Sequence, residues 1–249
     1  MRNRLARWGL NVGLVLIACT SGVATAAIAE AAPAGSCAAP AARANPHDRL
    51  TSGGFRFDVH PEKKWPNGAI PYYISERFDT DQRNVIERSI DRWNQRIRCL
   101  KLRPRAGEND YVNVTPGDYC SSDLGRQGGQ QRISLNTNGC VHQREVLRQF
   151  MFAAGIGWEH NSPDRDGYIE ILWDNIPEGQ RYLFEKQNPN DFRFLGSFDY
   201  YSVRMLPVTA VGATKPSYRV KRNGIDQSRI GRGDDFTDPD VNTVNTAYC

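Results

Sequence analysis

The feature that most constrains this chain is a set of six cysteines in a sequence whose first 26 residues have the pattern of an export leader. The cysteines stand at positions 19, 37, 99, 120, 140 and 249. Residues 1–26 start with basic side chains, pass through an apolar run from about Trp8 to Ala18 and end in small residues, which is typical of a secretory signal peptide. Disulfides persist in exported proteins, so cross-links are the first expectation for these cysteines.

Two questions about the cysteines stay open at this point. Five remain if Cys19 leaves with the leader, and we expect Cys37, in a stretch rich in alanine and proline, to be the unpaired one. The tetrapeptide from Leu16 to Cys19 also resembles a bacterial lipoprotein box, which would leave a lipid anchor at Cys19. Release of a soluble protein is the preferred interpretation, because such a tetrapeptide arises easily within an apolar run. A C-x-x-C zinc site is absent from the sequence.

Composition and charge exclude some classes of partner. Hydrophobic residues make up 39% of the chain and charged residues 24%, which suits a soluble domain with a real core. The net charge is +4, and lysines and arginines are scattered, so we expect no nucleic-acid partner. No stretch after the leader is apolar enough to span a membrane. We therefore expect a monomer that is secreted, extracellular or periplasmic.

The chain divides into three parts. Residues 1–26 are the expected signal peptide, and residues 27–64 are low in large apolar residues and rich in alanine, proline and glycine. Such a composition is typical of a linker or pro-segment. Organised sequence begins at Trp65, so we place one domain over residues 65–249.

Periodicity within that domain predicts strands first and helices later. We expect a strand over residues 69–74 and a helix over 78–97, capped by Asp79 or Thr80. The remaining expected elements are strands at 110–116 and 132–136 joined by a Gly/Ser-rich hairpin, a helix from His142 to about Gly157, a strand at 168–173 and a short helix at 179–187. The chain after Met205 shows few periodic signals. The pattern is that of an α+β domain with an irregular C-terminal half.

Several of these segments, in this order, resemble the astacin family of secreted zinc endopeptidases. They are WPNGAIPY from Trp65, DYVNVTPGDYCSSDLGRQGGQQRISL from Asp110, the pair Gly139–Cys140, SPDRDGYIEILWDNIPEGQRYLFEK from Ser162 and FDYYSV from Phe198. The resemblance covers residues 65–249. It implies an astacin/metzincin-like α+β domain with an N-terminal mixed sheet, two helices, an irregular C-terminal half and two disulfides. The implied disulfide pairs are Cys99–Cys249 and Cys120–Cys140.

The family's zinc segment, H-E-x-x-H-x-x-G-x-x-H-E, falls on residues that lack its chemistry. The three ligand positions hold Arg148, Phe152 and Trp158, and the position of the general base holds Gln149. The final glutamate is kept as Glu159, which the resemblance makes a candidate partner for the N-terminus of a mature enzyme.

A second segment of the family, S-x-M-H-Y, supplies a methionine beneath the metal and a tyrosine beside it. The tyrosine position here is Leu206, or Pro207 if Arg204 is treated as an insertion that leaves Met205 in register. Neither residue carries a hydroxyl.

These replacements share a physical logic. Zinc needs His, Cys or carboxylate donors, whereas Arg148 is permanently cationic and the rings of Phe152 and Trp158 offer none. Gln149 cannot accept a proton. We therefore predict no catalytic residue and no cofactor, although zinc is the cofactor of the family. We also expect Phe152, Trp158, Met205 and Leu206 to fill the vacated cavity together.

The sequence thus predicts an exported astacin-like pseudoprotease that binds a peptide or protein in the former substrate cleft. The candidate rim of that cleft comprises Arg126, Gln127, Gly128, Gly129, Gln130 and Gln131, which lead into a strand that offers main-chain hydrogen bonds. Two alternatives remain open. One is a zinc metalloendopeptidase with atypical ligands, and the other is a structural copy with no ligand.

Overall fold

The computed structural model describes residues 63–188, 198–210 and 213–249. The expected leader, the lipoprotein box and Cys37 lie outside these residues, so the structure does not test those predictions. Across the described part of the chain, every helix is too short or too polar to cross a membrane.

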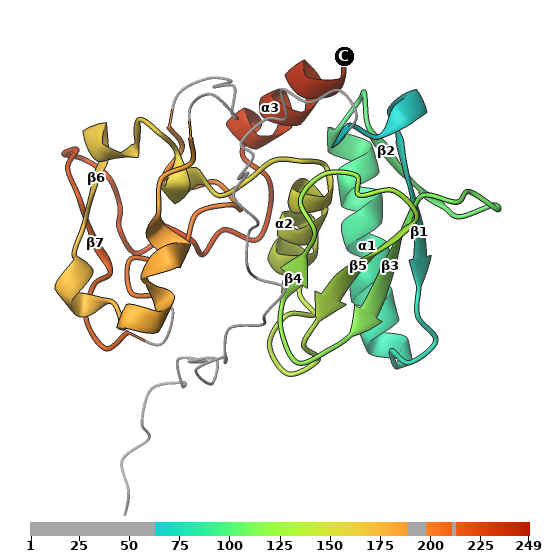
Figure 1. Cartoon of the computed structure of the whole chain (residues 1–249), viewed down its shortest axis with the longest axis horizontal. Coiled ribbons are helices and arrows are strands. Elements are labelled where there is room, and N and C mark those ends of the chain that lie inside the picture. The colour runs from blue at the N-terminus through green and yellow to red at the C-terminus, as the bar shows by residue number, and fades with distance from the viewer. Residues whose placement is uncertain (1–62, 189–197, 211–212) are drawn as a thin grey trace, which may run out of the picture. The chain divides into compact units, whose positions relative to one another are not determined.

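The first half of the domain is a five-stranded mixed sheet with two long helices (Figure 1). The strands are β1 (Ala69–Ile74), β2 (Lys101–Pro104), β3 (Tyr111–Pro116), β4 (Ser121–Ser122) and β5 (Gln130–Leu135), in the order β2-β1-β3-β5-β4. Only β4 runs antiparallel to its neighbour, which confirms the mixed sheet that the family resemblance implied.

Helix α1 (Thr80–Arg96) forms where its apolar spacing predicts it. Asp79 is the N-cap: its carboxylate accepts from the backbone N–H of Gln82, whose side chain accepts from the N–H of Asp79 in return. This reciprocal capping box satisfies two of the helix's first donors. The buried face carries Ile86, Ile90 and Trp93, as the period of the sequence indicates.

Helix α2 (Gln143–Ala153) is shorter than expected and ends in a tight turn. Gly155 has φ 86°, a left-handed conformation that favours glycine. Its N–H donates to Phe152 O at 2.8 Å, and the N–H of Ile156 donates to Met151 O at 2.9 Å. This is a Schellman motif, and it stops the helix before Gly157.

The C-terminal half contains more regular structure than the sequence indicated. The expected strand at 168–173 shortens to β6 (Ile169–Ile171), which pairs antiparallel with β7 (Tyr218–Val220), and the expected helix at 179–187 is a 3-10 helix, Glu178–Phe184. Further 3-10 turns are Pro66–Gly68, Glu159–Asn161, Arg165–Gly167 and Trp173–Asn175. Helix α3 (Asp238–Tyr248), which we did not expect, closes the chain under a capping box from Thr237 and Asp240.

Two disulfides fix this arrangement, and both pairings implied by the resemblance are confirmed. Cys99 joins Cys249, with Cα atoms 5.2 Å apart, and Cys120 joins Cys140, with Cα atoms 5.8 Å apart. The first bond ties the end of α1 to the end of α3. Cross-links of this kind stabilise mainly by restricting the unfolded chain.

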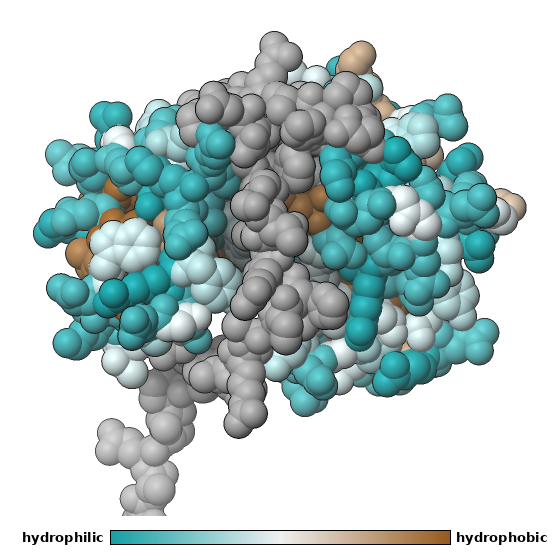
Figure 2. Space-filling view, in the orientation of Figure 1, coloured by the Kyte–Doolittle hydropathy of each residue, from teal (hydrophilic) through white to brown (hydrophobic). Residues whose placement is uncertain are grey.

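The buried apolar residues form two clusters. The larger joins the sheet to α1, α2 and α3, and includes Trp93, Phe150 and Phe236. The smaller gathers β6, β7 and the loops around them, with Phe184 and Tyr218 fully buried. The described surface in Figure 2 is correspondingly hydrophilic for the most part, with small apolar areas.

Candidate functional site

The site residues implied by the resemblance gather around the C-terminal half of α2 and the turn after it. Every residue from Arg144 to Ala153 is buried, so the charged side chains of this helix must find their partners inside the protein. The turn at Gly155 then returns the chain, and Trp158 meets Phe152 with ring centroids 4.9 Å apart. The structure therefore brings Arg148, Phe152 and Trp158 together.

Arg148 is held by three neighbours. Its side chain is only 8% exposed, and its Nη1 lies 2.9 Å from a carboxylate oxygen of Glu145, one turn earlier on α2. Its Nε donates to Val203 O at 2.8 Å, and its guanidinium lies over the Trp158 ring at 5.0 Å. A buried guanidinium persists only when it is paired in this way.

Gln149 belongs to the same cluster through Glu145. Its Nε2 donates to Glu145 Oε1 at 2.6 Å, so the carboxylate serves Arg148 and Gln149 at once. Within the described residues, Gln149 Oε1 is buried without a hydrogen-bond partner. The same is true of the Nε of Arg144, whose Nη2 donates to Met205 O at 2.7 Å. Burial, with Arg148 nearby, lowers the pKa of Arg144 to about 9.

Aromatic rings continue the cluster away from α2. Trp158 packs on His160 with centroids 5.1 Å apart, and His160 packs on Phe184 at 5.2 Å. His160 is fully buried, and its Nε2 faces Leu183 O at 3.2 Å. Burial lowers the pKa of this imidazole to about 3, so the ring is neutral at physiological pH.

The four residues expected to fill one cavity lie in two groups. Phe152 and Trp158 contact each other, whereas Met205 and Leu206 pack in the smaller apolar cluster with β6 and β7. The carbonyls of Met205 and Leu206 accept hydrogen bonds from Arg144 and from the Tyr218 hydroxyl. Met205 and Leu206 thus pack in the smaller cluster and not in one cavity with Phe152 and Trp158 as expected, with the carbonyl of Met205 bound by α2 and that of Leu206 by β7.

Glu159 faces a cation of its own chain. One carboxylate oxygen lies 2.7 Å from the Arg204 guanidinium, and the other accepts from the backbone N–H of Asp199 at 3.1 Å. Arg204 also pairs with Asp240 at 3.2 Å and donates to Gly157 O at 3.1 Å. Burial alone would lower the pKa of Arg204, but these two carboxylates raise it above its ordinary value. Glu159 thus has an internal partner, whatever it does with an N-terminus.

The candidate cleft rim consists of a loop, residues 126–129, and the first two residues of β5, Gln130 and Gln131. Arg126 pairs with Asp110 at 2.6 Å, and the N–H of Gly129 donates to the same carboxylate. Gln131 is buried and its side chain spans Gly125 and Gln127. Gly128 and Gly129 have φ of 84° and 70°, which suits this loop to glycine.

The strand that follows this loop is not the edge of the sheet. β5 lies between β3 and β4, so the edge belongs to β4, a two-residue strand next to the disulfide at Cys120. The expectation that Arg126–Gln131 lead into the exposed edge strand therefore needs this correction. The hairpin geometry folds the chain back and covers β5 where Ser121 and Ser122 pair with Ser134 and Ile133.

The described residues offer no complete set of metal ligands. Across residues 63–188, 198–210 and 213–249, no three His, Cys, Asp or Glu side chains converge closely enough to hold one. His142 caps α2, and His160 is enclosed between two aromatic rings. The residues around Arg148 do not fit zinc, because they present a guanidinium, an amide and two hydrocarbon-rich rings in place of neutral or anionic donors.

Sequence reasoning missed Glu145, Arg204 and Asp240 as members of the site. Glu145 had a signal, since it stands three and four residues before Arg148 and Gln149 and so shares their helix face. Arg204 and Asp240 had none, because their partners are distant in sequence.

Comparison with known proteins identifies the family that this chain resembles in sequence and fold. The family model described as "Astacin", a peptidase family, matches residues 57–249. The zinc metalloproteinase nas-8 of Caenorhabditis elegans is 34% identical over 188 residues, covering 75% of this chain and 46% of the relative. The zinc metalloproteinase nas-4 of the same nematode is 32% identical over 190 residues, covering 75% of this chain and 59% of the relative.

Among solved structures, high choriolytic enzyme 1, a hatching-enzyme zinc-protease of the medaka Oryzias latipes, superposes with a TM-score of 0.66. It is 28% identical, and the match covers 74% of this chain and 92% of that one. Myroilysin, at 15% identity and a TM-score of 0.56, shares the fold. The chain spans about half the length of the curated relatives it matches.

These relatives correct one expectation from the sequence. We predicted no cofactor, but the matched proteins are named zinc metalloproteinases, so zinc is the cofactor that the similarity implies. That prediction was based only on the residues at the family's ligand positions, and it did not take into account that the relatives bind zinc according to their names. The metal that the relatives imply and the donor set of the described residues thus disagree.

Proposed function

This chain belongs to the astacin family, and from that premise we propose that it is an exported, non-catalytic member that binds an extended peptide or protein segment. The two disulfides support export, because such bonds persist in oxidising compartments. The proposal concerns hydrolysis and binding, and it is independent of how much metal the protein carries.

The observation that carries the proposal is the engagement of Arg148. This residue takes the first ligand position of the family motif, and its guanidinium is bound to Glu145, Val203 O and the Trp158 ring. Releasing it would leave a buried carboxylate without its cation, which costs several kcal/mol. The cluster therefore favours a closed, packed site over one that opens to admit a scissile bond.

The groups at the other catalytic positions support the same conclusion. An amide at Gln149 cannot act as a general base, since it has no basic lone pair at neutral pH. It is instead committed to Glu145 through a 2.6 Å hydrogen bond. Leu206, at the tyrosine position, offers no hydroxyl to a developing oxyanion.

Binding is assigned to the edge of the sheet. β4 is the outer strand, runs antiparallel to β5 and covers only part of its length. An extended peptide adds to such an edge by main-chain hydrogen bonds. The loop with Arg126 and Gln131 lies next to it and remains the proposed rim.

A zinc endopeptidase with atypical ligands is the second candidate, favoured by the names of the relatives. The two functions are separated by incubating the full chain, with zinc supplied, with denatured casein and a quenched-fluorescence peptide library. We expect no cleavage above a heat-inactivated sample. Cleavage that a chelator abolishes, and that survives repurification, would establish the enzyme instead.

The binding half is tested with the same peptide library, immobilised, and two single variants of β4. Successive strand residues direct their backbone groups to opposite sides, so only one of Ser121→Pro and Ser122→Pro removes an outward N–H. We expect one variant to keep its thermal stability and lose peptide binding. If both keep parental binding, the edge is not the binding site.

A further inference from the structure

A second surface of the domain lies on the side of the sheet away from the helices. Strand residues alternate between two faces, and Ile70, Val112 and Ile133 point into the larger core with α1 and α2. The opposite positions form what we call the outer face. Its members include Tyr73, Arg103, Tyr111, Asn113, Gln130 and Arg132.

The sheet register arranges these side chains in rows. Tyr73 pairs with Asn113, and Asn113 pairs with Arg132, so three side chains cross three strands in one line. Neighbouring strands lie about 4.8 Å apart, so this row spans roughly 10 Å. Alongside it, Tyr111 pairs with Gln130, and its hydroxyl hydrogen-bonds the Gln130 side chain.

The outer face is basic. The outward positions of β1, β2, β3 and β5 carry Lys101, Arg103 and Arg132 and no carboxylate. Lys101 is engaged with carbonyls at the end of α1, and Arg103 is paired with Glu108 at 3.0 Å. Arg132 is exposed, and its guanidinium donates to a carbonyl, Pro116 O. Arg105 adds a further cation, 4.0 Å above the Tyr111 ring.

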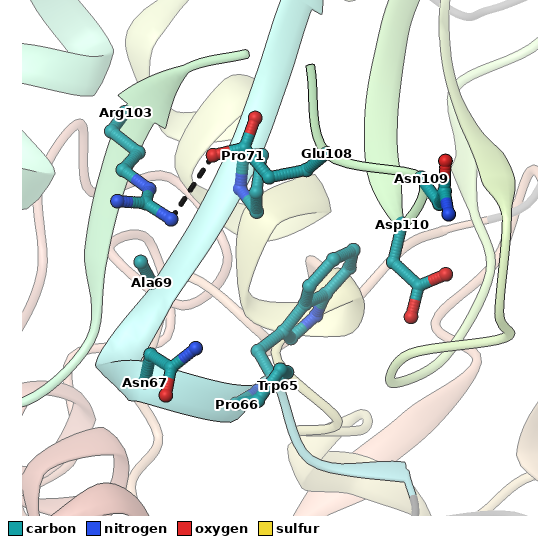
Figure 3. A pocket seen from close by; sticks show the side chains of 9 residues that line it. All are labelled: Trp65, Pro66, Asn67, Ala69, Pro71, Arg103, Glu108, Asn109 and Asp110. Carbon is teal, nitrogen blue, oxygen red and sulfur yellow. Dashed lines mark ion pairs between the residues drawn. The ribbon is translucent and has the colours of Figure 1, made fainter. Parts of the chain in front are cut away.

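A pocket continues the outer face at the β1–β2 side (Figure 3). It encloses about 360 Å³, within the range of about 300–1,000 Å³ of small-ligand sites. Pro71 and Arg103 belong to both the strands and the pocket. Its wall combines apolar Trp65 and Pro66 with the amides and carboxylates of Asn67, Glu108, Asn109 and Asp110.

Three features of the outer face define its ligand. Tyr73 exposes 45% of its surface beside the Asn113 amide, whose Oδ1 is buried without a hydrogen-bond partner among the described residues. The backbone of the central strands β1 and β3 is paired on both sides, so recognition must come from side chains. Planar rings for stacking, amides for hydroxyls and cations for acidic groups lie together.

We infer that the outer face binds an anionic polysaccharide, independently of the proposed peptide edge. The pocket beside it carries the carboxylates of Glu108 and Asp110 in its wall, so the acidic groups of the ligand would lie on the strands and not in the pocket. Sugar rings would stack on the tyrosines, hydroxyls would meet the amides, and sulfate or carboxylate groups would meet Arg105 and Arg132. An acidic peptide fits less well, because its backbone would find no free strand partner on this face.

The test uses the full chain, immobilised heparin and an isothermal titration with a heparin oligosaccharide. Arg105→Gln with Arg132→Gln should weaken binding by about tenfold, in line with the loss of two exposed ion pairs. The matched control is Arg88→Gln with Arg232→Gln, two exposed arginines elsewhere with the same loss of charge. Tyr73→Ala should also weaken binding while leaving the melting temperature unchanged.

The outcomes separate three cases. Weakening confined to the outer-face variants, with no binding of neutral dextran, supports the proposal. Equal weakening by the control pair would show adsorption through net charge and overturn it. Polyglutamate that binds as tightly as heparin and displaces it would make the partner an acidic protein, which also overturns it.

Discussion

Two buried arginine clusters lie close to each other and differ in their balance of charge. Around Arg204, one guanidinium meets the carboxylates of Glu159 and Asp240 and the carbonyl of Gly157. Around α2, Glu145 pairs with Arg148 at 2.9 Å, while the guanidinium of Arg144 donates to a carbonyl, Met205 O, and lies near the charge of Arg148.

The clusters differ also in the buried polar atoms that have neither a hydrogen bond nor an ion pair within the described part of the chain, since Glu159 Oε2 in the Arg204 cluster is paired with Arg204 at 2.7 Å. Among the described residues, the α2 cluster leaves Arg144 Nε and Gln149 Oε1 buried without a hydrogen-bond partner. In the other cluster, Asp240 accepts from the Ser202 hydroxyl and from Val203 N–H in addition to Arg204. Unpartnered buried polar atoms cost free energy. The comparison teaches that the Arg204 cluster is built for stability, whereas the α2 cluster occupies the positions at which the family motif places its metal ligands.

The largest expected effect comes from breaking the Arg204 cluster. Arg204→Met should lower the free energy of unfolding by about 3–5 kcal/mol, because it leaves two carboxylates buried without their cation. Urea denaturation measures the change. The control, Arg219→Met, breaks an exposed pair with Glu170 and should cost only about 0–1 kcal/mol. Similar small losses for both variants would remove the distinction drawn between the clusters.

The aromatic pair beside Arg148 should give the next largest effect. Phe152→His replaces a ring that is only 7% exposed, and we expect a cost somewhat below the ~3–5 kcal/mol of a Phe-to-Ala truncation. Adding Trp158→His should cost less than a second full increment, since the two rings touch. Thermal melting in the presence of a chelator tests this. A double variant that melts with the parent would mean that these positions are not packed.

A pH-dependent effect is expected at His160, whose ring packs against Trp158 and Phe184. Its pKa is lowered to about 3 by burial, so between pH 6.5 and pH 3 the unfolded chain binds the proton that the folded chain excludes. Stability is therefore fully present above pH 6.5 and falls with pH, by about 2 kcal/mol at pH 5. His160→Gln should remove this part of the slope. Parallel pH curves for parent and variant would show that His160 is protonated in the folded state.

Local signals explain which parts of the fold were predictable. α1 follows from its capping box and apolar period, and β1 was placed at its observed bounds. β2 was not predicted from the sequence, because only one of its four residues, Leu102, is buried. Its extended conformation depends on pairing with β1. α3 was missed although Thr237 and Asp240 form a capping box, because its apolar content is low and it is held by a disulfide and Asp240.

The candidate site divides in the same way. Alignment with the family's zinc segment was enough to identify Arg148, Gln149, Phe152 and Trp158 as the residues at its ligand and base positions. Their partners were not, because Arg148 reaches Val203 and Glu159 reaches Arg204 only through tertiary folding. The expectation of no cofactor was wrong for another reason, because it relied on the replaced positions alone although the relatives are named zinc metalloproteinases.

The most direct test of the central claim is a double-mutant cycle between Arg148 and Glu145, using Arg148→Met and Glu145→Gln. If the α2 cluster is a closed, paired site, the coupling energy in unfolding should be at least about 1 kcal/mol. The exposed pair of Arg83 and Glu87, also on a helix, serves as the control and should couple by about 0.3–0.5 kcal/mol. A coupling for Arg148 and Glu145 no larger than that of the control would contradict the account, because the site would then be open and its arginine free.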